Sequence, residues 1–166
     1  LWYDMHQPLF ETFSAETLKR FEDGHRSEAL MASRLRMVAG IQLWTVDPDT
    51  GDQFAATDFG GKFGGHMDGV ILGLLQAPKT PHVWEAKAVS DKKFREFQKL
   101  KAELGEKATL AKWDHVYWTQ AQAYMGYFDL ARHYITVSTP GVREWDSART
   151  EFDPAAFIKI KDKARR

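Results

Sequence analysis

Three charged residues near the middle of the chain have types and a spacing that suit hydrolytic chemistry. Asp68 precedes an apolar run, and Glu85 and Lys87 lie two positions apart in the segment Trp84-Glu85-Ala86-Lys87. Side chains alternate between the two faces of a strand, so Glu85 and Lys87 are expected on the same face. Two carboxylates beside an ammonium group can hold a divalent cation and a water molecule.

The residue types also indicate how the chemistry would be divided. Asp68 and Glu85 offer the oxygen ligands that Mg²⁺ and Mn²⁺ prefer. Lys87 can hold an attacking water or stabilise charge that develops on a phosphate, and a buried lysine can also act as a base with a lowered pKa. This set predicts phosphodiester hydrolysis. The alternative is a solvated Glu85–Lys87 ion pair, with Asp68 as a turn residue beside Gly69.

The composition limits the possible classes of protein. With 166 residues and 43% hydrophobic content, the chain is expected to form one domain over residues 1–166. Its formal net charge is zero, so a nucleic-acid-binding face would have to arise from local clustering. The chain has no cysteine, which excludes disulfides, thiolate zinc sites and cysteine-ligated iron–sulfur clusters.

The sequence predicts no membrane partner. No apolar run approaches the roughly 20 residues that span a bilayer, and no charged-then-apolar leader opens the chain. Leu1 is not a methionine, which indicates a processed, trimmed or partial chain. A cytoplasmic location is the expectation.

Helical and extended patterns alternate along the chain, after an aromatic-rich lead-in over residues 1–13. Helices are expected over residues 15–40, 90–104 and 113–130 and from 154 onward, with Ser14, Ser90 and Asp153 as N-caps. Strands are expected over residues 41–46, 53–59, 62–72, 82–89, 132–138 and 142–151. The first two strands would form a hairpin around the turn at residues 47–51. This order predicts an α/β domain with a mixed central β-sheet flanked by helices.

Four short motifs occur in order along the chain: Gly24-His25-Arg26-Ser27-Glu28, Gly65-His66-Met67-Asp68-Gly69, Trp84-Glu85-Ala86-Lys87, and Gln120 with Tyr124 as Gln-x-x-x-Tyr. Together they resemble the PD-(D/E)XK nuclease superfamily, in its RecB-like and YqaJ-like phage-type exonuclease branch. The motifs span residues 24–124, which is most of the chain. The resemblance implies a restriction-endonuclease-like core.

The resemblance also implies a metal site. Glu28, Asp68 and Glu85 would bind one or two Mg²⁺ or Mn²⁺ ions, with the backbone carbonyl of Ala86 as a further ligand. His25 competes with Glu28 for the ligand position on the first helix. Iron–sulfur members of this branch use cysteines that this chain lacks, so no such cluster is expected.

The catalytic group implied by the resemblance consists of Asp68, Glu85, Lys87, Gln120 and Tyr124. Lys87 would be the catalytic lysine. Gln120 and Tyr124 lie one helical turn apart, so they would share a face and contact Lys87, the water or the substrate strand. The aromatic residues of this helix would also serve simply to build a core.

Three more residues are candidates for substrate binding. Lys92 and Lys93 begin a helix with a basic outer face directly after the Glu85–Lys87 strand, where they could contact phosphates. His66 shares the strand face of Asp68. A solvated helix face and a structural histidine are the corresponding alternatives.

The implied activity is that of a metal-dependent DNA nuclease. An exonuclease of DNA recombination, repair or phage DNA processing is favoured over an endonuclease, in a bacterial or phage-infected cell. The partner would be single- or double-stranded DNA, with ends favoured, and a homo-oligomer is compatible with the sequence. Two alternatives stay open: a catalytically inactive DNA-binding or assembly module with the same fold, and a metal hydrolase that acts on another phosphate ester.

Overall fold

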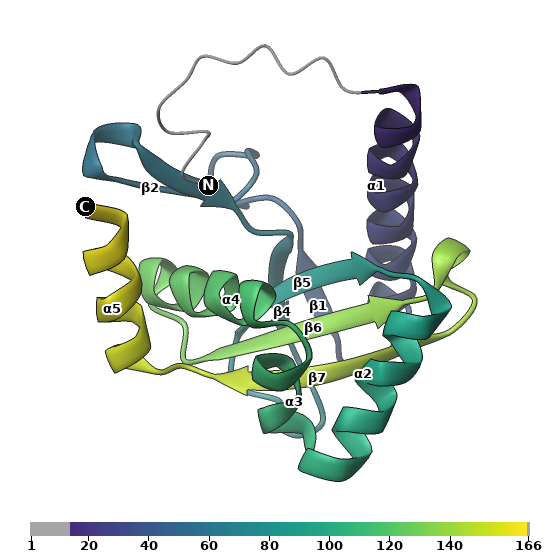
Figure 1. Ribbon diagram of the computed structural model, residues 1–166. Helices are drawn as coiled ribbons and strands as arrows, with labels where there is room; N and C mark the ends of the chain where they lie inside the picture. The colour runs from purple at the N-terminus through teal and green to yellow at the C-terminus, as the bar shows by residue number, and fades with distance from the viewer. Residues whose placement is uncertain (1–13, 166) are drawn as a thin grey trace.

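A five-stranded mixed sheet forms the centre of the molecule (Figure 1). The computed structural model describes residues 14–165, so the predicted lead-in over residues 1–13 lies outside the described residues. The strand order is β1-β4-β5-β6-β7; β5 and β6 run parallel and the other neighbours are antiparallel. The strands are β1 (Gln42–Trp44), β4 (Gly69–Leu72), β5 (His82–Ala88), β6 (Arg132–Ser138) and β7 (Trp145–Glu151). The expected α/β class with a mixed central sheet is confirmed.

Helices cover both faces of this sheet, which explains why apolar side chains on both faces of β5 are buried. Helix α1 (Ala15–Arg36) packs Met31 and Leu35 against the face that carries Trp84. On the other face, Phe94 and neighbouring apolar side chains pack against Val83. This second layer consists of α2 (Asp91–Leu104), α3 (Glu106–Trp113) and α4 (His115–Phe128). Burial of each large apolar side chain contributes about 1.5–3 kcal/mol.

The helix starts follow local capping signals. Ser14 Oγ accepts a hydrogen bond from Thr17 N at 3.2 Å, and Ser90 Oγ accepts one from Lys93 N at 3.3 Å. At α5 (Pro154–Arg165), Asp153 caps the first turn, as predicted. None of the helices within residues 14–165 combines the length and the apolar character that a bilayer span requires.

Two helix boundaries differ from the prediction. Helix α1 ends at Arg36 instead of continuing to residue 40, because the chain turns there to enter β1. The segment between α2 and α4, for which the sequence predicted no element, forms the additional helix α3. Asp114 then caps α4, since its Oδ1 accepts hydrogen bonds from the backbone N–H groups of Val116 and Tyr117, at 3.0 and 3.1 Å. The predicted helix over residues 113–130 therefore begins at His115.

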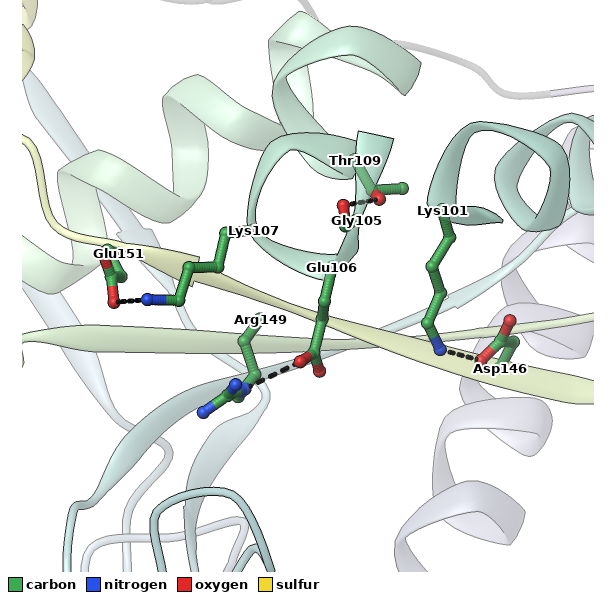
Figure 2. A network of polar contacts seen from close by, with 8 residues as sticks. All are labelled: Lys101, Gly105, Glu106, Lys107, Thr109, Asp146, Arg149 and Glu151. Atoms are coloured by element: carbon green, nitrogen blue, oxygen red, sulfur yellow. Dashed lines mark hydrogen bonds and ion pairs between the residues drawn. The ribbon is translucent and has the colours of Figure 1, made fainter. Parts of the chain in front are cut away.

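Polar contacts tie the additional helix to the edge strand (Figure 2). Arg149 Nε donates to Glu106 Oε2 at 3.0 Å, and Lys107 Nζ lies 2.5 Å from Glu151 Oε1. These pairs join α3 to β7 and hold the helix layer against the outer part of the sheet.

The predicted hairpin between residues 41–46 and 53–59 is wrong. Strand β1 pairs with β4, whereas β2 (Ala55–Asp58) pairs with β3 (Phe63–His66) in a separate two-stranded sheet. The predicted strand over residues 62–72 is therefore divided, and Asp68 lies at the division. Gly69 makes the β1–β4 approach possible, because a Cβ atom there would lie 2.3 Å from the carbonyl oxygen of Trp44.

Candidate functional site

The division between β3 and β4 places Asp68 at the open edge of β5. The ladder between β4 and β5 ends at the pair Gly69–Trp84. Beyond it, the backbone N–H of Ala86 donates to Asp68 Oδ2 at 2.8 Å. The N–H and C=O groups of one strand residue point to the same side. The Ala86 carbonyl therefore faces the edge where Asp68 lies, which supports its predicted place among the ligands.

Glu85 and Lys87 share a strand face, as predicted, and form an ion pair between Oε1 and Nζ. Glu85 is only 3% exposed. Its second oxygen, Oε2, is buried and has no hydrogen-bond partner within the described residues. An unsatisfied buried carboxylate oxygen is costly, so a fold that retains one is expected to use it.

The site carries more negative than positive charge. Burial raises the pKa of Glu85 to about 7; Lys87 opposes this shift, while Asp68 and Glu28 add to it. Burial is also the main cause of the raised pKa values of Asp68 and Glu28. Three carboxyl groups therefore lie around one ammonium group.

The same surplus keeps Lys87 protonated. Burial alone would lower the pKa of Lys87, but Glu85 and Asp68 outweigh burial and raise it. The charged ammonium is suited to hydrogen-bond donation.

Helix α1 supplies the remaining acid. Glu28 and His25 line an open cavity of about 520 Å³ together with Asp68, so the structure brings both first-helix candidates to the site. Their positions one turn apart on α1 explain why both face this cavity. Glu28 comes from the helix on the Trp84 face of the sheet, and its carboxyl is electrostatically coupled to Asp68 and Lys87.

The donor chemistry fits a hard divalent cation. Glu28, Asp68 and Glu85 provide carboxylate oxygens, and one of these is the orphaned buried oxygen of Glu85. In the present conformation, no three histidine, aspartate or glutamate side chains of residues 14–165 are grouped closely enough to hold an ion.

Gln120 and Tyr124 share a helix face, as predicted, and form a hydrogen-bonded chain. Gln120 Nε2 donates to Tyr124 Oη at 3.0 Å, and Tyr124 Oη donates to the backbone carbonyl of His66 at 2.5 Å. Gly65 permits this approach, because a Cβ atom there would lie 2.8 Å from Tyr124 Oη. The expected contact of these residues with Lys87 is not among the described hydrogen bonds; they secure the end of β3, two residues before Asp68.

Tyr117 belongs to the site and was missed in the sequence. Its ring centroid lies 5.3 Å from Lys87 Nζ and 5.0 Å from Lys93 Nζ, so both ammonium groups lie over one aromatic ring. The spacing contains a usable signal, because Tyr117 lies three residues before Gln120 and seven before Tyr124 on the same helix.

The predicted substrate-binding residues separate into two groups. Lys93 approaches the site through Tyr117 and also pairs with Asp114 Oδ2 at 2.6 Å. Lys92 and the side chain of His66 are exposed, and no described contact connects either with the acidic residues. His66 contributes through its backbone carbonyl instead.

Comparisons with known proteins leave the family open. No family model and no curated protein matches the chain. The crystal structure of SSO0001 is similar with a TM-score of 0.45 and 15% sequence identity, over 86% of this chain and 57% of that chain. The chain thus spans less than two thirds of that protein, and a likeness this weak indicates neither a shared activity nor a shared family.

Proposed function

We propose that this chain is a metal-dependent nuclease that hydrolyses phosphodiester bonds in DNA and has a restriction-endonuclease-like core. The observation that supports this most is the electrostatic coupling of Glu28, Asp68, Glu85 and Lys87 near the open edge of β5, where Asp68 accepts a hydrogen bond from the backbone N–H of Ala86. These residues come from α1, from the segment between β3 and β4, and from β5. A buried surplus of carboxylates, with one oxygen unsatisfied, favours a divalent cation.

The ligands of Mg²⁺ or Mn²⁺ would be Glu28, Asp68, Glu85 and the Ala86 carbonyl. A bound ion supplies a lowered pKa for its water and stabilises charge on the phosphate. Lys87 is held by Glu85 and the Tyr117 ring, and its ammonium would donate to the attacking water or a phosphate oxygen.

Gln120 and Tyr124 are positioning residues in this proposal. Their hydrogen bonds secure the carbonyl of His66, and Asp68 follows two residues later. A fixed β3 end limits the positions that Asp68 can take relative to Ala86. We assign exonuclease rather than endonuclease activity on the resemblance of the motifs, with DNA recombination, repair or phage DNA processing as the setting.

Cleavage of end-labelled linear DNA and of closed circular DNA, with Mg²⁺ or Mn²⁺, tests this function. We expect the linear substrate to be degraded, and Lys87→Ala to lower the rate by about 10²–10³-fold. Lys107→Ala is the matched control, because it removes a lysine from a surface ion pair on α3. The proposal fails if the wild type cleaves no DNA with either metal, or if Lys87→Ala cleaves as the wild type does.

A second candidate is a DNA-binding or assembly module without catalysis. It is favoured by the ion pair between Glu85 and Lys87, which engages the lysine in a contact within the protein. It predicts that DNA is retained in a mobility-shift assay while metal produces no turnover. If the protein hydrolyses a small phosphodiester and DNA does not inhibit that reaction, the protein is instead a phosphoesterase that acts on another substrate.

A further inference from the structure

The cavity beside the acidic residues has a second end of opposite charge. Glu28, His25 and Asp68 line one part, and Arg36, Thr45 and Gln53 also line it. Glu28 and Arg36 are eight residues apart on α1, which corresponds to about 12 Å along the helix axis. The α1 residues that line the cavity between them are Ala29 and Ala32, so no long side chain of this helix separates the two ends.

Arg36 is held in place but keeps free donors. Its Nε donates to the carbonyl of Leu43 and its Nη2 donates to Thr45 Oγ1, both at 3.0 Å. These bonds fix the guanidinium plane against β1. No carboxylate partner for Arg36 is present in residues 14–165, in contrast to Arg95, whose guanidinium bonds both oxygens of Glu144. A guanidinium has five N–H donors, and the unused ones suit a phosphate.

We infer that this end of the cavity is a phosphate subsite for the substrate strand, with Arg36 as its cationic ligand and Thr45 and Gln53 as polar neighbours. The inference rests on the proposed nuclease function and states where the strand lies. DNA phosphates are repelled by the carboxylates at one end of the cavity and attracted by the guanidinium at the other. The separation of about 12 Å along α1 means that Arg36 would hold a phosphate away from the cleaved bond.

Binding of a fluorescent single-stranded oligonucleotide in EDTA, measured by anisotropy between 50 and 200 mM salt, tests the subsite without turnover. We expect Arg36→Ala to weaken binding about 10-fold and to reduce the slope of log K against log salt by about 0.7. Arg34→Ala is the matched control. Arg34 lies in the same last turn of α1 and also donates to a backbone carbonyl, that of Val142, but does not line the cavity.

Several outcomes separate the subsite from the nuclease function. Equal binding and equal salt slopes for Arg36→Ala and Arg34→Ala overturn the subsite, as does a wild type that binds no oligonucleotide. If Arg36→Ala weakens binding while the wild type never cleaves, the subsite stands and the nuclease function fails. Arg36→Gln removes the charge but keeps a side-chain donor, so it should reduce the slope as Arg36→Ala does; this variant decides the question if Arg36→Ala does not fold.

Oligonucleotides with and without a 5′-terminal phosphate distinguish the source of the phosphate. An equal loss for both, on replacing Arg36 by alanine, supports an internal phosphodiester as the ligand. A loss confined to the phosphorylated oligonucleotide supports a terminal phosphate. With an active protein, Arg36→Ala should raise KM and leave kcat unchanged.

Discussion

The candidate site and the surface between α3 and β7 use the same residue types with opposite consequences. On that surface, each acid is matched by one base: Glu151 by Lys107 and Glu106 by Arg149 (Figure 2). The hydrogen bond from Lys107 lowers the pKa of Glu151. At the site, burial raises the pKa of Glu85 although it also has a lysine partner.

The comparison shows that burial and charge balance decide what an ion pair contributes. An exposed, matched pair such as Lys107–Glu151 is solvated, contributes little free energy, and serves to hold one element near another. A buried group of carboxylates that outnumbers its basic partners carries unfavourable excess negative charge. A bound cation can offset that charge. Four substitutions test this contrast.

The largest effect is expected for Glu85→Gln, which removes a ligand and the orphaned carboxylate oxygen. Mn²⁺ at 100 times its Kd should stabilise the wild type by about 2.7 kcal/mol, or about 5–10 °C in Tm. Glu85→Gln should abolish this shift, and Glu151→Gln should keep it.

Calorimetry in buffers of different ionisation enthalpy should show that the wild type releases protons when it binds Mn²⁺ below about pH 7, because the raised pKa leaves Glu85 partly protonated there. A shift retained by Glu85→Gln would contradict the ligand role.

The burial of His133 should make the free energy of unfolding depend on pH in the opposite direction to the burial of Glu85. His133 is 1% exposed, its Nδ1 has no described partner, and burial followed by the charges of Lys87 and His82 lowers its pKa to about 3. The unfolded chain takes up a proton near pH 6.5 and the folded chain does not. Stability is therefore complete above about pH 6.5 and falls as the pH drops towards 3.

Urea unfolding between pH 4 and 8 measures this dependence. His133→Leu should flatten the loss of stability on the acid side, whereas the exposed control His115→Gln should retain it. The same acid slope in His133→Leu and the wild type would refute the prediction.

A moderate effect is expected for Tyr124→Phe, which breaks the link between α4 and β3 near Asp68. We expect kcat to fall about 10-fold to 10²-fold, because a small displacement of a catalytic group is sufficient for such a loss. Tyr127→Phe is the control, since it removes a hydroxyl bond to Asp58 on the same two-stranded sheet. Equal kcat values for the two variants would show that the Tyr124 bond does not position the site.

The smallest effect belongs to Lys107→Ala. It removes one side of an exposed pair, so Tm should change by less than about 2 °C and cleavage should stay at the wild-type rate. Thermal melting and the cleavage assay measure both. A loss of several degrees would show that matched surface pairs matter more than their exposure suggests.

The amino-acid sequence by itself determined the local features. Strand alternation placed Glu85 and Lys87 on one face, and Ser14, Ser90 and Asp153 start helices where predicted. Capping and alternation depend on neighbours within a few residues, so the chain carries these signals directly. The α/β class followed from the same signals.

Only the tertiary structure decided the pairings and the charge balance. Strand β1 joins β4 across the Asp47–Gly51 turn and the β2–β3 hairpin, and no local pattern records this choice. The raised pKa of Lys87 depends on Glu85 and Asp68, and Arg36 joins the cavity because β1 folds back on α1. Electrostatic interactions and burial depend on distances in three dimensions and not on separation along the chain. The sequence therefore supplies the charged residues, and the fold determines their pKa values and contacts.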